Sequence, residues 1–206
     1  MNQRQAHKHA ARERILEAAS ERLRSEGLGG AAIAAVMRDA DLTHGAFYAH
    51  FANKDALAAA ALGHALASNR ERWVGDEQLG RDESWPQRLK RLAKRYLHIK
   101  HRDDWSSSCA LGALAGESAR SGPAFQATFA EELKRSLDAI CQGDFAKADT
   151  PIQQQSLAFM ALCVGGITLA RAVGDDDISD DILSACRKHA TALSALSRAG
   201  SDTHTR

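Results

Sequence analysis

The chain has 206 residues and nearly balanced charge, with 27 Lys and Arg against 26 Asp and Glu. This balance excludes a global polycation, so any contact with nucleic acid must come from a local surface. Three prolines, 5% aromatic residues and abundant alanine and leucine argue against a β-sandwich and favour helices. The 4 cysteines are widely spaced and form no Cys-x-x-Cys pair, which indicates neither a zinc ribbon nor a disulfide framework.

Targeting and membrane signals are weak. The basic stretch 1–14 is not followed early enough by an apolar run to make a signal peptide. The longest stretch without charge, 150–170, contains three consecutive glutamines, and its apolar part is shorter than the ~20 residues of a bilayer crossing. We expect a buried helix there, and a soluble, cytoplasmic protein.

Helical periodicity dominates the first 74 residues. Apolar residues at 15, 16, 19 and 23 predict one helix, which glycines at 27, 29 and 30 end. A short helix is expected over 33–37, followed by a break at 39–42. Thr43 is expected to cap another short helix ending near Phe51, and Asn53 to cap a long helix that reaches Val74.

The remainder also predicts helices, and no strand pattern occurs in it. After a loop at 75–82, Ser84 or Trp85 begins a helix whose apolar stripe extends to Ile99. Thr150 and Ser179 are the expected caps of the last two long helices. The expected helices run over 84–99, 109–119, 123–140, 152–173 and 179–198.

Residues 33–53 carry the clearest functional pattern, two short helices joined by a tight turn. Gly45 and Ala46 leave the outer face of the second helix nearly bare, and donors surround this patch at Thr43, His44, Tyr48 and His50. Such a face suits a helix lying in a DNA major groove. Lys54 adds a cation beside the first amide groups of the next helix, which suits a phosphate.

The run 40–57, ADLTHGAFYAHFANKDAL, resembles the helix-turn-helix of TetR-type (TetR/AcrR) transcriptional regulators. The resemblance covers about residues 12–66, and the helical layout of the remainder agrees with it. It implies an all-α fold with a three-helix DNA-binding domain over 1–54, whose motif lies at about 32–52. A helical ligand-binding and dimerisation domain over 55–200 and a disordered tail over 201–206 would follow.

The same resemblance assigns the DNA contacts. It places Tyr48 and Lys54 on phosphates. Two departures leave the operator preference open: Asp41 replaces the usual turn glycine, and Ala31 and Ala34 stand where the family often has a Thr cap and a polar side chain. The DNA-facing side of the recognition helix would hold Thr43, His44, Gly45, Ala46 and His50.

The resemblance also implies partners: a double-stranded DNA operator, a small-molecule effector without cofactor or metal, and a second copy paired through helices 152–173 and 179–198. The apolar character of 152–173 and the Gly165-Gly166 pair favour this pairing independently, whereas the core helix of a monomer is the alternative. The candidate effector-cavity residues, for which plain core packing is the alternative, are Trp105, Cys109, Phe125, Phe129, Phe159 and Met160.

The predicted function is a sequence-specific DNA-binding regulator, a repressor relieved by ligand that binds a palindromic operator as a homodimer. One alternative is a redox-sensing repressor switched through Cys109, expected at a helix N-terminus where thiol acidity rises, against an inert buried thiol. A more distant alternative is a helical adaptor or small-molecule enzyme without DNA binding. No Gly-rich phosphate loop, Gly-x-Ser-x-Gly elbow or His-Glu-x-x-His motif occurs, so we expect no enzyme.

Overall fold

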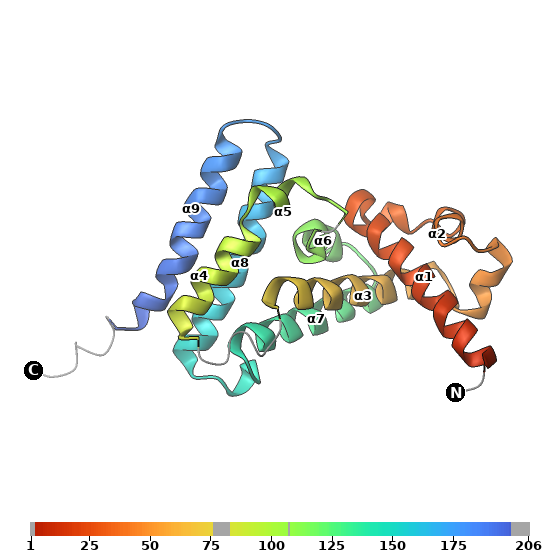
Figure 1. Cartoon of the computed structure of the whole chain (residues 1–206), viewed down its shortest axis with the longest axis horizontal. Coiled ribbons are helices and arrows are strands. Elements are labelled where there is room, and N and C mark those ends of the chain that lie inside the picture. The colour runs from red at the N-terminus through yellow and green to blue at the C-terminus, as the bar shows by residue number, and fades with distance from the viewer. Residues whose placement is uncertain (1–2, 76–82, 107, 199–206) are drawn as a thin grey trace, which may run out of the picture. The chain divides into compact units, whose positions relative to one another are not determined.

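The computed structural model describes residues 3–75, 83–106 and 108–198, which form helices and contain no strand (Figure 1). The all-helical prediction is therefore confirmed. The chain divides into two compact units: unit 1 comprises Met1–Asn69 and Trp105–Leu133, and unit 2 comprises Arg70–Asp104 and Lys134–Arg206. Because these units follow packing, they differ from the predicted division at residue 54, which stays a prediction.

Unit 1 is built around α1 (Gln3–Glu26), which packs on α2, η1 and α6. Its buried face carries Ile15, Leu16, Ala19 and Leu23, at the spacing that the sequence predicts. The other elements of this unit are η1 (Gly27–Ala31), α2 (Ile33–Asp39), η2 (His44–Ala49), α6 (Ala110–Ser118) and the first parts of α3 (Lys54–Val74) and α7 (Pro123–Cys141).

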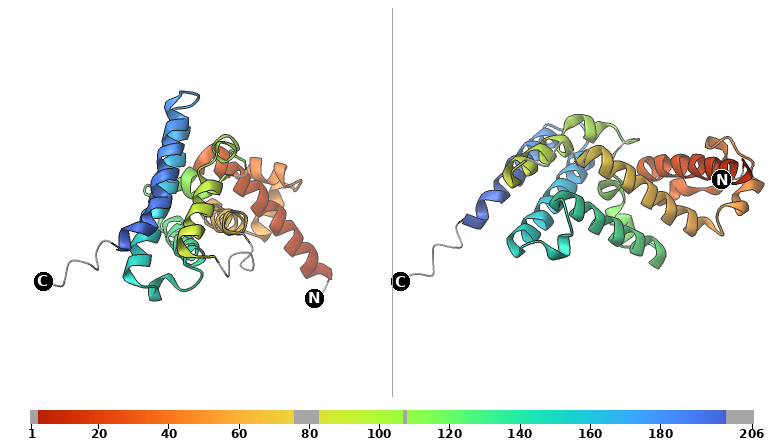
Figure 2. Two further views of the ribbon diagram at one scale, coloured as in Figure 1. Left: turned by 60° about the vertical axis from the view of Figure 1, so that its left-hand side comes forward. Right: turned by 60° about the horizontal axis from the view of Figure 1, so that its bottom comes forward.

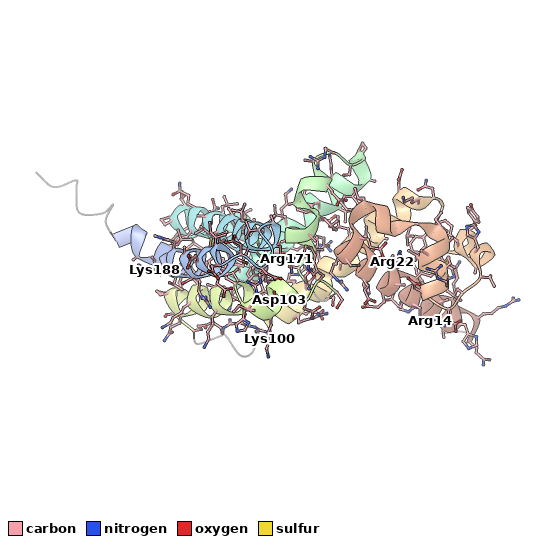
Figure 3. All side chains as sticks on the ribbon, turned by 90° about the horizontal axis from the view of Figure 1, so that it is seen from above. Arg14, Arg22, Lys100, Asp103, Arg171 and Lys188 are labelled. Atoms are coloured by element: carbon pink, nitrogen blue, oxygen red, sulfur yellow. The ribbon has the colours of Figure 1, made fainter. Side chains whose placement is uncertain are left out.

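Polar contacts fix the register of unit 1. The Glu117 Oε2 atom of α6 accepts the Leu28 N–H at 2.6 Å, against Gly27, whose φ of +70° places it in the left-handed region. On the other side of α1, the Arg22 guanidinium (Figure 3) donates to Asp39 Oδ2 at 2.7 Å. These two bonds join segments that are distant in the sequence: Leu28 and Glu117 are 89 residues apart, and Arg22 and Asp39 are 17 residues apart.

Unit 2 centres on α8 (Thr150–Ala172) and α9 (Ile178–Ala192), which lie side by side, with α4 (Trp85–Tyr96) packed on both (Figure 2). Trp73 lies 4.6 Å from Tyr96 and 6.2 Å from Phe159, measured between ring centroids, at the centre of this unit. A Cβ at Gly166 would lie 2.9 Å from Cys186 Sγ, so this glycine lets α8 and α9 approach closely. The remaining elements are α5 (Ile99–Asp103), η4 (Phe145–Lys147) and η5 (Leu193–Arg198).

A second junction in unit 2 joins α5 to α8 and α9. Arg102 Nη1 donates to Asp180 Oδ1 at 2.7 Å and to Ser179 Oγ at 3.0 Å. Arg171 donates from α8 to the Arg102 carbonyl at 3.0 Å, close to Asp103 (both labelled in Figure 3). The short helix α5 is therefore held by guanidinium groups from two directions.

Several predicted helix ends are confirmed and others are wrong. Asn53 Oδ1 accepts the Ala56 N–H at 2.8 Å and caps α3 as predicted. Thr43 occupies the N-cap position of η2, as predicted, but its side chain makes no cap bond. Ile99 does not continue the α4 stripe: α4 ends at Tyr96, and Ile99 begins α5 with 45% of its surface exposed.

The starts of α8 and α9 differ by one or two residues from the prediction, and α9 ends at Ala192 instead of continuing to residue 198, because 193–198 form the 3₁₀ segment η5. Asp149, rather than Thr150, is the N-cap of α8, and Asp177 is the N-cap of α9. Ser179 lies inside α9, where its buried hydroxyl donates to the Ala170 carbonyl at 2.7 Å. Ser179 does not cap α9 because it lies within the first turn of the helix and not ahead of it. Of the predicted loop 75–82 only Gly75 lies within the described residues, and the predicted tail 201–206 lies outside them.

By length and composition alone, α8 could cross a membrane, with a mean hydropathy of 1.3 in its most apolar window. However, 44% of that window is buried inside the structure, and the core helix of a globular protein passes the same test. Among the described helices no other reaches this limit.

Candidate nucleic-acid interface

The segment Thr43–His50 turns one side into unit 1 and the other side outward. Phe47 is wholly buried and Phe51 nearly so, and their stacked rings lie 5.9 Å apart. These two aromatic anchors fix which side of η2 faces out. The exposed residues are Thr43, His44, Gly45, Tyr48 and Ala49, whereas Ala46 and His50 are half-buried.

The outward edge is open at its centre and flanked by two rings. No atom lies within 4 Å of the place where a Cβ would stand at Gly45. The Tyr48 side chain is 67% exposed, and its ring meets the His44 ring edge-on at 6.4 Å. A flat surface can therefore approach the backbone of η2 between hydrogen-bonding groups.

The turn between α2 and η2 is tight. Asp41, which replaces the usual turn glycine, has φ +53°, the left-handed conformation that aspartate tolerates better than most residues. The Leu42 N–H donates to the Met37 carbonyl at 2.9 Å and closes the turn. A hollow of about 450 Å³ opens beside it, lined by Ala34, Met37, Arg38, Asp41, Leu42, Thr43 and His44.

The start of α3 lies at the end of this edge. Lys54 is exposed and is the first residue of the helix. The first amide groups of a helix have no acceptor within it, and they carry partial positive charge. Lys54 and these amides therefore form a small cationic site, which the carboxylate of Asp55 in the same turn moderates.

His50 faces α1 in part rather than lying fully on the open edge. Its Nδ1 atom is buried without a hydrogen-bond partner in the described residues. Burial, followed by the positive charges of Lys8 and Arg12, lowers the pKa of His50 below its usual value. The Arg12 guanidinium lies 5.2 Å from the centroid of the Phe51 ring. The sequence reasoning assigned no contact to these α1 cations, although Lys8 and Arg12 are in phase with the apolar stripe that starts at Ile15.

The predicted effector-cavity residues divide between the two units, and their common cavity stays a prediction. In unit 2, Phe159 is wholly buried against Trp73 and Met160 is nearly so. In unit 1, Trp105 is 45% exposed, Phe125 is buried and Phe129 half-buried. Cys109 is the N-cap of α6 and is 5% exposed.

Of the other thiols, Cys141 and Cys186 are poorly suited to ionisation. None of the four cysteines forms a disulfide. Burial raises the pKa of Cys141 and of Cys186. Within the part of the chain that the structure describes, no three His, Cys, Asp or Glu side chains come together as metal ligands.

An exposed apolar stripe runs along α8, away from its contacts with α9. It contains small and apolar residues at a spacing of four, so they share one face of the helix. Leu157 is 50% and Leu169 58% exposed, and nothing lies within 4 Å of a Cβ at Gly165. We call this face the α8 stripe; its members are Leu157, Ala161, Gly165 and Leu169 of the helix, together with its C-cap residue Val173.

Comparison with known proteins agrees with this geometry. Residues 15–61 match the family model of bacterial regulatory proteins, tetR family. A search of curated proteins finds no match. The matched residues contain α2, η2 and the start of α3, which together form the helix-turn-helix described above.

Solved structures share the fold along almost the whole chain. The reduced form of NemR from Escherichia coli has a TM-score of 0.68 at 17% identity, covering 87% of this chain and 94% of that one. A TetR transcriptional regulator from Chloroflexus aurantiacus has a TM-score of 0.67 at 20% identity, covering 90% and 94%. A TetR-family regulator from Streptomyces coelicolor has a TM-score of 0.61 at 22% identity, covering 90% and 98%. Residues 15–61 thus match the helix-turn-helix domain of the tetR family, and the chain as a whole has the helical fold of these solved structures.

Proposed function

We propose that the protein is a transcriptional repressor that binds a palindromic operator as a homodimer in the cytoplasm and releases it when a small molecule binds. The observation that carries this proposal is the open edge of η2, where nothing lies within 4 Å of the Cβ position at Gly45 between His44 and Tyr48. An edge without bulky side chains lets the backbone approach base pairs closely, while its flanks supply donors.

The geometry supports different roles along this edge. Thr43 and His44 are exposed at the start of η2, so we assign base contacts to them, with Gly45 and Ala46 allowing the approach. Tyr48 and Lys54 are exposed at its far end and suit phosphate oxygens. His50 is assigned to the rim of the contact, because it is half-buried and lies near Lys8 and Arg12 of α1.

A second copy of the chain fits the α8 stripe. An exposed row containing Leu157, Leu169 and Val173 is unfavourable in water, and the small Gly165 at its centre permits close helix contact. Together with α9, this face would form a two-fold symmetric interface. Two recognition segments related by that symmetry require an inverted repeat in the DNA.

The proposed release mechanism uses α3, whose residues up to Asn69 belong to unit 1 and whose last residues belong to unit 2. A small molecule bound among the helices after residue 84 would tilt α3 and change the separation of the paired recognition segments. Coupling of this kind amounts to about 1–3 kcal/mol, or a 5–150-fold change in affinity. The candidate residues for such a site are Trp105, Cys109, Phe125 and Phe129 in unit 1, and Phe159 and Met160 in unit 2.

A thiol switch at Cys109 is the second candidate. Its N-cap position on α6 favours the thiolate, whereas its 5% exposure restricts access by oxidants. Alkylation of the folded protein distinguishes a reactive Cys109 from an inert buried thiol. If Cys109 reacts only after denaturation, the switch is rejected.

Selection of bound duplexes from a random pool tests the main proposal. We expect enrichment of an inverted repeat, a weaker and less salt-dependent affinity for Lys54→Gln on every sequence, and an altered base preference for His44→Ala. Lys90→Gln, at an exposed position of α4, is the matched control. No enrichment would favour a helical adaptor, and turnover of a metabolite library would favour an enzyme.

A further inference from the structure

The amino-terminal half of α1 carries cations on the same face that packs into the core further along the helix. Positions 4, 8 and 12 are Arg, Lys and Arg, and this row continues in phase into the buried residues Ile15, Leu16 and Ala19. Apolar side chains thus give way to cationic ones where α1 runs past the core of unit 1. We call Arg4, Lys8 and Arg12 the cationic row.

The cationic row points toward the recognition segment. Arg12 lies over the Phe51 ring at 5.2 Å, directly after η2. Lys8 and Arg12 both lie close enough to His50 for their charges to act on it. Since helix neighbours at a spacing of four share one face, Arg4 extends the same line toward the helix end, where the backbone itself carries positive charge.

The carboxylates of α1 lie elsewhere. Residues 3–12 contain no Asp or Glu. Glu17 Oε2 lies 3.0 Å from His64 Nε2 of α3, and Glu13 Oε2 lies 3.8 Å from His64 Nδ1. Arg14 (Figure 3) and Glu21 line a separate hollow beside α2. Glu13 Oε1 also lies 3.9 Å from His9 Nε2, so these carboxylates meet His9, His64 or the hollow beside α2, whereas the charges that act on His50 are those of Lys8 and Arg12.

We propose that the cationic row is a second contact surface for duplex DNA, which binds backbone phosphates beside the groove occupied by η2. The proposal rests on the proposed function, because it needs η2 to face DNA. It adds up to three phosphate contacts that carry no base information. The row would strengthen binding to every sequence alike and leave the operator preference to His44 and Thr43.

Salt dependence measures these contacts directly. The affinity for duplex DNA falls with salt with a logarithmic slope of about 0.9 for each phosphate neutralised. The double variant Arg4→Gln/Lys8→Gln should therefore lower the slope by about 1.8. Between 50 and 200 mM KCl the wild-type affinity should then fall about twelvefold more than that of the variant. Both positions are exposed and far from the core, so the variant should fold, which circular dichroism checks.

The matched control is Lys90→Gln/Lys94→Gln, which removes two exposed cations at the same spacing from α4. Fluorescence anisotropy with the selected inverted repeat and with a random duplex of equal length should give an unchanged slope for this control. The charge-preserving Arg4→Lys/Lys8→Arg should also keep it, whereas the ratio of operator to random affinity should stay constant in all variants.

The outcomes separate the two proposals. Normal wild-type binding with an unchanged slope for Arg4→Gln/Lys8→Gln overturns the cationic row alone. An equal loss of slope in the α4 control also overturns it, since net charge would then explain the effect. Failure of the wild-type protein to bind any duplex overturns both proposals.

Discussion

Replacing Gly27 with alanine should lower the free energy of unfolding by about 2–5 kcal/mol, because two effects meet at this position. Gly27 has φ +70°, and the left-handed conformation costs a residue with a Cβ about 1–2 kcal/mol. The new Cβ would also lie 2.2 Å from Glu117 Oε1, so the carboxylate must move. The Leu28 N–H, now bonded to Glu117 at 2.6 Å, then loses its acceptor, which costs about 1–3 kcal/mol when the donor is shielded from water.

Urea denaturation followed by circular dichroism measures this loss, and Gly29→Ala is the matched control. Gly29 lies in the same turn without a positive φ, and nothing stands within 4 Å of its Cβ position, so its substitution should change stability by less than about 0.5 kcal/mol. Because Glu117→Ala removes the obstructing carboxylate, the double variant should be destabilised by less than the sum of the single ones. Equal stabilities of the Gly27 and Gly29 variants would refute the contact between Gly27 and Glu117. Strictly additive effects of Gly27→Ala and Glu117→Ala would refute it as well.

Three further outcomes follow from single contacts. Asn53→Ala should lower the free energy of unfolding by about 1 kcal/mol in thermal or urea denaturation, because the Asn53 side chain caps α3. Thr43→Ala should change it little, because the Thr43 side chain makes no cap bond. Arg88→Met should be destabilised by about 2–4 kcal/mol, because Arg88 is buried and donates to two carbonyls at the end of α7; Lys90→Met, which is exposed, should stay near the wild type. The free energy of unfolding should fall as the pH drops below about 6.5, because burial lowers the pKa of His101 and the unfolded chain therefore binds the proton first. In His101→Gln the melting temperature should depend less on pH. An unchanged pH dependence in this variant would show that His101 is not the cause.

Local periodicity predicted the parts of the fold that rest on contacts between neighbours in sequence. Phe47 and Phe51 are four residues apart, and both prove to be the buried anchors of the recognition segment. Asn53 is followed at three residues by the amide it caps. Such signals are readable because a helix brings together residues three and four apart.

Contacts between distant segments left no such signal. The bond between Glu117 and Leu28 joins residues 89 apart, and a single glutamate in a sequence of mixed charge cannot reveal its acceptor role. Ile99 seemed to extend the α4 stripe because periodicity says nothing of the turn at Leu97, where φ −89° and ψ 56° end the helix. Sequence reasoning assigned no contact to the cations in the amino-terminal half of α1, because the buried apolar residues of this helix begin only at Ile15.

The form of η2 explains why the fold was easier to predict than the operator. A 3₁₀ segment of six residues has weak backbone hydrogen bonds of its own, so its position depends on the burial of Phe47, about 1.5–3 kcal/mol, and on the capped helix that follows. The outward residues Thr43, His44 and Tyr48 contribute little to that anchoring because they are exposed. Under the proposed function, their identity can therefore follow the DNA sequence while the buried residues keep the fold. Substitution of His44 should accordingly change which duplex is bound and leave the melting temperature unchanged, whereas Phe47→Ala should lower both stability and affinity for every duplex.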